Sequence, residues 1–384
     1  MKRRIYLAAM LAMAAPAVLW ADAQAPGPNR QPVANQQPKI QLAILLDTSN
    51  SMDGLIDQAR QQLWQAVNEF SKAKRDGVTP ELEVAVYEYG NNGIDARQGH
   101  TRQVVGLTRE LDKVSEALFS LTTNGGNEYC GHVIARAVDG LQWGTSPNDV
   151  KAIFIAGNEP FTQGPTPFAE AISAAKARGI VVNTVHAGDY QAGVSEGWRQ
   201  GALLAGGNYM SIDHNQAVVH VETPQDEQIS SLNAQLNKTY IPYGMEGAAG
   251  AARQQEQDSK SSGVSTGLLA ERAKAKAMAF YNNARWDLVD AVEAGEADLD
   301  KMEPEALPEE MQAMTPEARK AFVDERAKER AELKAKIVEL SRQRDAYAAE
   351  QLKDQAAESA DTLNEALTES VRQQAVSRDF VFAE

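Results

Sequence analysis

The 384-residue sequence has a single cysteine, Cys130, and therefore cannot form a disulfide within the chain. Packing has to stabilise the fold, even if the protein is exported to an oxidising compartment. Cys130 is not accompanied by the pattern of His and Asn residues that thiol enzymes use. We therefore interpret it as a small buried apolar residue.

Signatures of several enzyme classes are missing as well. The sequence has no P-loop, and its two G-x-S-x-G matches, at 193–197 and 263–267, do not directly follow an apolar strand run as a nucleophile turn does. Three of its five histidines, His132, His186 and His214, suggest a transition-metal site but do not have the spacing of a zinc site. His186 directly follows the apolar run at 181–185, and we interpret it as a hydrogen-bonded structural residue. The sequence thus predicts a protein that is not an enzyme.

An excess of basic charge is also absent. The 38 Lys and Arg residues are outnumbered by 53 Asp and Glu residues, which gives a formal net charge of −15. Such a surface repels nucleic acids and anionic lipid headgroups. We therefore expect neither of them as a partner.

The N-terminus has the three parts of a secretory signal peptide. Residues 2–4 are basic, residues 5–19 form a short apolar run, and two alternative A-x-A cleavage sites follow at 21–23 and 23–25. The apolar run is short for a membrane span, and no cysteine follows it for lipid attachment. We predict a signal peptide over 1–25, a flexible Pro- and Gln-rich linker over 26–38, and no transmembrane anchor after cleavage. The expected location is the periplasm of a Gram-negative bacterium, or the medium.

Short apolar runs alternate with helical patterns over residues 39–243. The runs predicted as strands cover residues 40–46, 82–89, 102–107, 150–156, 180–185 and 209–212. Alternating strands and helices are typical of parallel sheets that are covered on both faces. We predict an α/β fold with a doubly wound, mainly parallel sheet.

The first of these strands ends in a cluster of oxygen-bearing side chains. Asp47, Ser49 and Ser51 follow the apolar run at alternate positions, and an amphipathic helical pattern begins directly after them. Ligands of parallel sheets bind at the carboxyl ends of the strands. Carboxylate and hydroxyl oxygens are the ligands that Mg²⁺ prefers. The alternative interpretation is a helix N-cap, where Asp, Ser and Thr are common.

This D-x-S-x-S motif between a strand and a helix resembles the metal-ion-dependent adhesion site of von Willebrand factor type A (VWA) domains. The resemblance covers about residues 39–221. It implies that one divalent cation, Mg²⁺ or else Mn²⁺ or Ca²⁺, binds to Ser49 and Ser51, with Asp47 acting through water or nearby. It further implies a protein partner whose Asp or Glu side chain completes the metal site.

The resemblance is weaker in the two other loops that form such a site. In place of the threonine of the second loop, the sequence offers Thr123, slightly early, and then Glu128 after two glycines. In place of the aspartate of the third loop, it offers Asn158 and Glu159 after the strand at 150–156. Either glutamate could supply an anionic oxygen, and a fixed glutamate would weaken the bond to a partner's carboxylate. The alternative interpretation of the third loop is a turn that caps the strand.

The last third of the sequence has a different composition. Residues 244–264 are rich in Gly, Ala, Gln and Ser and are predicted to form a linker. Residues 265–384 are rich in Ala, Glu, Lys and Arg and are predicted to form an α-helical hairpin with a coiled-coil-like seam. Thr315 and Pro316 have the pattern of a helix start.

Three functions fit these patterns. The preferred one is an exported binding protein that recognises a protein partner through the cation site. The alternative is an envelope scaffolding protein with a degenerate metal site, which interacts through its C-terminal helices. A hydrolase acting at Asp47, Glu128 and Glu159 is the weakest interpretation, because fold alone does not indicate catalysis.

Overall fold

A computed structural model describes residues 37–215, 221–352 and 363–382. The predicted signal peptide and nearly all of the predicted linker at 26–38 lie outside these residues. Within the described ranges, no helix is long and apolar enough to cross a membrane.

The predicted α/β fold is confirmed. Six strands form one sheet in the order β4-β3-β1-β5-β6-β7. All neighbours are parallel except the edge pair β3 and β4. The strands are β1 (Lys39–Asp47), β3 (Glu81–Tyr89), β4 (Thr101–Thr108), β5 (Val150–Gly157), β6 (Val181–Ala187) and β7 (Tyr209–Ile212). The strand that carries the D-x-S-x-S motif is therefore central in the sheet.

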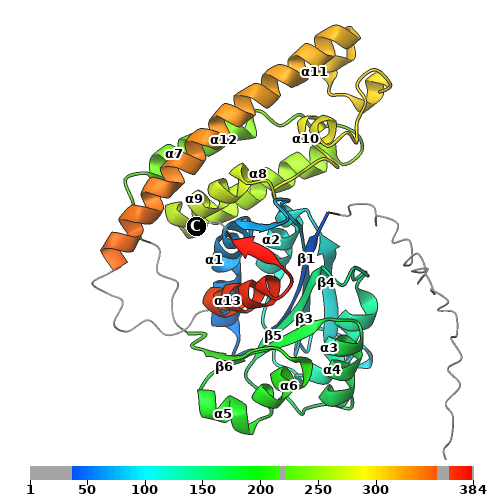
Figure 1. Cartoon of the computed structure of the whole chain (residues 1–384), viewed down its shortest axis with the longest axis vertical. Helices are drawn as coiled ribbons and strands as arrows, with labels where there is room; N and C mark the ends of the chain where they lie inside the picture. The colour runs from blue at the N-terminus through cyan, green and yellow to red at the C-terminus, as the bar shows by residue number, and fades with distance from the viewer. Residues whose placement is uncertain (1–36, 216–220, 353–362, 383–384) are drawn as a thin grey trace, which may run out of the picture. The chain divides into compact units, whose positions relative to one another are not determined.

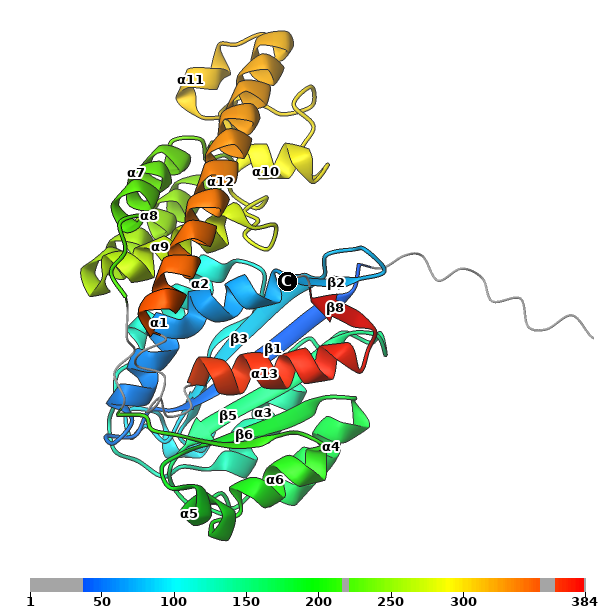
Figure 2. The ribbon, with the colours of Figure 1, turned by 60° about the vertical axis from the view of Figure 1, so that its left-hand side comes forward.

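Helices cover both faces of this sheet (Figures 1 and 2). One face carries α1 (Asp53–Phe70), α2 (Leu111–Ser120) and α13 (Leu363–Val376), and the other carries α3 (Cys130–Gly140), α4 (Phe168–Ala177) and α6 (Trp198–Ala205), with the short α5 (Tyr190–Ser195) beside it. Along β1, Leu42, Ile44 and Leu46 enter one hydrophobic core, whereas Ala43 and Leu45 enter the other. This alternation is why the strand is apolar throughout. It also directs Asp47 to the α3 side of the sheet.

The end of the chain returns to the sheet, which the sequence did not indicate. Helix α13 packs on α1 and over β5 and β6, and buries Val371 and Ala375 completely. The strand β8 (Phe380–Phe382) then pairs with β2 (Ala73–Arg75), the short strand that follows α1. The prediction that residues 265–384 form one helical hairpin is wrong in this part. The sheet region is completed by the C-terminus, and the other helices form an insertion into it.

The insertion consists of helices that lie between β7 and α13 in the sequence. They are α7 (Asp226–Asn237), α8 (Gly247–Val264), α9 (Thr266–Ala277), α10 (Leu288–Glu293), α11 (Glu309–Gln312) and the long α12 (Pro316–Leu352), with a 3₁₀ turn η2 (Pro304–Ala306). The predicted start of a helix at Pro316 is confirmed, and the Thr315 hydroxyl accepts a hydrogen bond from the amide of Ala318. Helix α12 packs against α7 and α9.

The predicted linker at 244–264 is wrong, because most of these residues, Gly247–Val264, form α8. A Cβ atom at Gly250 would lie 2.3 Å from the Trp286 ring, so this glycine lets the indole pack directly on the helix backbone. The small residues therefore serve close packing. The insertion has a hydrophobic core of its own, which includes Tyr240, Trp286, Leu333 and Ile337.

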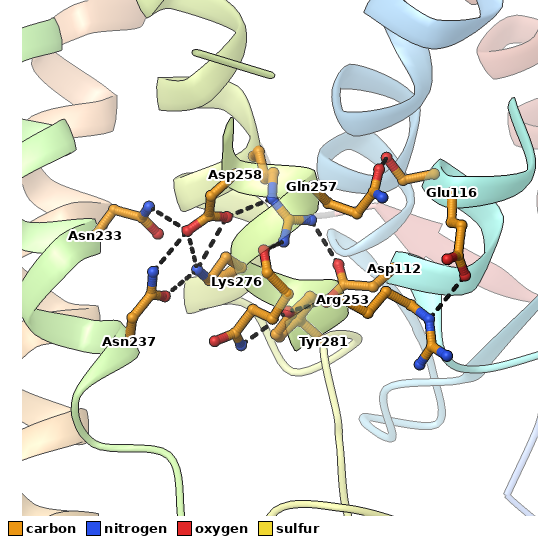
Figure 3. Close-up of polar contacts among 12 residues, drawn as sticks. Asp112, Glu116, Asn233, Asn237, Arg253, Gln257, Asp258, Lys276 and Tyr281 are labelled. Carbon is orange, nitrogen blue, oxygen red and sulfur yellow. Dashed lines mark hydrogen bonds and ion pairs between the residues drawn. The ribbon is translucent and has the colours of Figure 1, made fainter. Parts of the chain in front are cut away.

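Charged side chains hold the insertion against the sheet region (Figure 3). Arg272 of α9 is completely buried and donates to Asp112 of α2 and to Asp258 of α8, both at 2.6 Å. Its guanidinium also lies 4.7 Å from the Trp64 ring of α1. Lys276, also completely buried, donates to Asp258 at 3.0 Å. Two carboxylates and two cations thus form a balanced buried network, which we call the α2–α9 network.

Candidate metal site

The D-x-S-x-S loop makes a tight turn at the carboxyl end of β1. Asp47 is completely buried, and its Oδ1 accepts a hydrogen bond from the amide of Ser49 at 2.8 Å. The Ser49 and Ser51 hydroxyl oxygens lie 3.5 Å apart. Asp47 Oδ2 is buried and has no hydrogen-bond partner. A buried carboxylate oxygen without a partner is costly, and this one belongs to the loop that also carries the two serine hydroxyls.

The second loop brings Glu128 to Asp47. Both side chains lie against Gly90, which follows β3 and has a φ of +77°. A Cβ atom at Gly90 would lie 2.7 Å from Asp47 Oδ1 and 2.9 Å from Glu128 Cγ. Glu128 is 6% exposed, although it lies in a loop. Only a glycine leaves room for both carboxyl groups at this point.

The third loop contributes Asn158. Its side-chain amide donates to the Ser51 hydroxyl at 3.1 Å, while its Oδ1 is buried and has no partner. Glu159 lies further out, where its carboxylate accepts a hydrogen bond from Gln163. The structure therefore gathers five of the seven predicted residues: Asp47, Ser49, Ser51, Glu128 and Asn158. Their role as metal ligands stays a prediction.

Thr123 lies at the edge of this group. Its hydroxyl donates to Asp53 Oδ1, at the start of α1, at 2.7 Å.

Sequence reasoning missed two glycines, Gly90 and Gly157, that shape the site. A Cβ atom at Gly157 would lie 3.0 Å from Asp47 Oδ2 and 2.4 Å from the Tyr89 hydroxyl. A glycine at the end of a strand beside the motif was the available signal.

The carboxyl groups are in an environment that disfavours their charge. Burial raises the pKa of Asp47 to about 7, against hydrogen bonds from Ser49 and with a further increase from Glu159. Burial, and then repulsion by Asp47 and Glu159, raises the pKa of Glu128 to about 7. Neither group forms an ion pair with Lys, Arg or His in the part of the chain that the structure describes.

We do not include Cys130 and His186 among the candidate ligands of a cation. Cys130 is buried, as predicted, and burial raises the pKa of its thiol far above the usual range. His186 is 3% exposed, and its Nε2 lies 3.5 Å from Glu196 Oε2. Its ring lies beside Trp198. These contacts agree with a structural role for His186.

The side chains gathered at this site are oxygen donors, which suit a hard cation. Among the described residues, no three His, Cys, Asp or Glu side chains are close enough to hold a metal ion. A cation would therefore need the hydroxyls of Ser49 and Ser51 and the free Asn158 oxygen besides the carboxylates. All of these are oxygen donors, which favours Mg²⁺, Mn²⁺ or Ca²⁺ over softer metals. The orphaned Asp47 Oδ2 is an atom whose missing partner a bound cation would supply.

Comparisons with known proteins add little beyond this geometry. No protein-family model and no curated protein matches the sequence. Among solved structures, proximal thread matrix protein 1 from the mussel byssus is 12% identical with a TM-score of 0.32, over 45% of this chain and 41% of its own. A second structure of that protein is described as having a zinc-occupied MIDAS motif.

Two other solved structures are similar to the same extent. BatB from Bacteroides thetaiotaomicron is 16% identical with a TM-score of 0.34, over 45% of this chain and 90% of its own. The SpRpn10 VWA domain is 18% identical with a TM-score of 0.33, over 47% of this chain and 99% of its own. These values are too low to indicate a function, so the argument depends on the residues themselves.

Proposed function

We propose that this chain is an exported binding protein that holds one divalent cation, Mg²⁺ or Mn²⁺, at the end of β1 and recognises a protein partner there. The observation that carries the proposal is Asp47 Oδ2, which is buried and lacks a hydrogen-bond partner, in the same loop as the Ser49 and Ser51 hydroxyls, which lie 3.5 Å from each other. When bound, the cation would supply a Lewis-acidic point to which a partner oxygen can bind.

Each residue of the site has a distinct part in this proposal. Ser49 and Ser51 would offer hydroxyl oxygens, and Asp47 would offer charge. Asn158 positions the Ser51 hydroxyl through its 3.1 Å hydrogen bond. Because Asp47 is at the end of a central strand that is buried on both faces, the site is held rigidly.

Cation-dependent capture of a partner tests the proposal. The mature protein would be immobilised and exposed to bacterial envelope extract with Mn²⁺ or with EDTA, next to a Ser49→Ala, Ser51→Ala double variant. We expect one protein that is retained by the wild type only with Mn²⁺ and that binds it again after purification. The matched control is Ser173→Ala, a substitution of an exposed serine on α4.

Partner binding that is the same with EDTA and in the double variant would contradict the proposal. It would favour the second candidate, an envelope scaffolding protein that interacts through its helices. The insertion offers a surface on which a partner could bind, because the Leu232 and Leu340 side chains line an open apolar groove between α7 and α12.

A further inference from the structure

We propose that Glu128 is an internal anionic ligand of the cation, so that the position left for a partner accepts a neutral oxygen, an amide carbonyl or a hydroxyl, and not a carboxylate. This inference rests on the proposed function and makes it more specific. It also departs from the expectation that an Asp or Glu of the partner completes the site.

Glu128 is fixed at the site by the backbone of its loop. The amide of Asn124 donates to the Thr48 carbonyl at 3.0 Å, and the amide of Asn92 donates to the Gly125 carbonyl at 3.1 Å. The amide of Gly125 in turn donates to Asn50 Oδ1 at 2.7 Å. The second loop is therefore tied to the D-x-S-x-S loop on one side and to the turn after β3 on the other.

The glycines of these loops show how closely they approach each other. A Cβ atom at Gly126 would lie 2.4 Å from the Gly90 carbonyl oxygen, and one at Gly90 would lie 2.9 Å from Glu128 Cγ. Both contacts are too short for any other residue. The Glu128 side chain, 6% exposed, is thus enclosed beside Asp47.

The charge at the site decides what a partner can bring. Asp47 and Glu128 together balance the two charges of a divalent cation, and Glu159 repels both of them from nearby. A carboxylate from a partner would be a surplus negative charge in a partly buried place, where electrostatic repulsion is strong. A neutral carbonyl or hydroxyl oxygen brings a lone pair without this repulsion, so it fits the remaining position better.

The first test measures Mn²⁺ affinity by calorimetry in the wild type, Glu128→Gln and Glu159→Gln. We expect at least tenfold weaker binding in Glu128→Gln, which removes the charge and keeps the shape. Glu159→Gln, the matched control at a neighbouring carboxylate, should change the affinity less than threefold. Equal affinity of Glu128→Gln and the wild type would overturn the inference but leave the proposed function intact. No Mn²⁺ binding by the folded wild type would overturn the proposed function itself.

The second test probes the open position with acetate. Water-proton relaxation reports the waters on bound Mn²⁺, and a ligand that binds the ion displaces them. We expect acetate to leave the relaxation of the wild-type complex unchanged and to lower it in Glu128→Thr, which replaces the carboxylate by a hydroxyl. Thermal unfolding shows that each variant is folded. Equal displacement of water by acetate in the wild type and in Glu128→Thr would contradict the inference.

Discussion

Two groups of buried carboxylates in this chain differ in one respect. In the α2–α9 network, Asp112 and Asp258 are neutralised by Arg272 and Lys276 of the chain itself. At the end of β1, Asp47 has no such partner among the described residues. The first group is complete and links two parts of the molecule. The second is incomplete, and an external cation is what would complete it.

The pKa values show the same difference. Burial by itself raises the pKa of Asp258, but attraction to Lys276 and Arg272 and hydrogen bonds from Asn237 and Asn233 outweigh it, and the pKa lies well below the usual range. For Asp47 the effect of burial prevails, and the pKa is raised to about 7. Similar burial thus has opposite results, because only one of the two sites contains cations.

The largest expected effect comes from breaking the complete group. Arg272→Ala leaves Asp112 and Asp258 buried without their shared partner, and should lower the free energy of unfolding by about 3–5 kcal/mol. Chemical denaturation measures this change. Arg342→Ala, which removes an exposed ion pair on α12, is the control and should have no measurable effect. Equal stability of the two variants would contradict the structural role of the network.

Removing one negative charge from each group sharpens the comparison, because the free energy of unfolding should decrease in one variant and increase in the other. Asp112→Asn replaces the ion pair with Arg272 by a neutral hydrogen bond and should destabilise the protein by about 3 kcal/mol. Asp47→Asn removes an uncompensated buried charge and should stabilise the metal-free protein by about 1–2 kcal/mol at pH 7.5. Denaturation of both variants in EDTA makes the comparison. Destabilisation of the metal-free protein by Asp47→Asn would show that Asp47 is compensated after all.

The pH dependence of stability follows from the raised pKa of Asp47. The folded state binds a proton at this group more tightly than the unfolded state, whose pKa is near 3.8. The stabilisation from protonated Asp47 is therefore fully present below about pH 4 and is lost as the pH rises to about 7, a decrease of about 4 kcal/mol in the free energy of unfolding of the metal-free protein. Denaturation curves at several pH values in EDTA measure it. Asp47→Asn should lack this part of the decrease, and an unaltered pH profile in that variant would refute the assignment.

The smallest effect is expected at the edge of the site. Thr123 donates its hydroxyl to Asp53, so Thr123→Ala should change Mn²⁺ affinity less than threefold. Ser51→Ala, at a hydroxyl inside the site, should lower the affinity at least tenfold. Calorimetric titration of both variants separates the two positions. A large loss in Thr123→Ala would place the threonine among the ligands.

The sheet could be predicted because its pattern is local. The apolar run ending at Asp47 and the helical spacing after it are both visible within about 30 residues of sequence. The return of α13 and β8 to the sheet could not be predicted in this way. The pairing of Phe380 with Arg75 joins residues that are distant in the chain, and no local pattern records it.

The composition of α8 was misleading for a related reason. Gly250 is a poor helix residue by intrinsic propensity, and it is in the helix because Trp286 packs against it. At the site, the residue types were visible in the sequence but not their proximity. Glu128 is brought to Asp47 by the turn at Gly90, which belongs to a third segment of the chain. In both cases the structure depends on tertiary contacts, which the helix propensities and local patterns of the sequence do not record.

Calorimetric titration of the metal-free protein with Mn²⁺ at pH 7.5, next to Asp47→Asn, tests the central claim most directly. The account predicts one saturable site in the wild type and at least tenfold weaker binding in Asp47→Asn, since the variant keeps the shape of the side chain and loses its charge. Absence of saturable binding in the folded wild type would contradict the account. Asp47 and Glu128 would then be buried carboxylates that the protein tolerates in their protonated form.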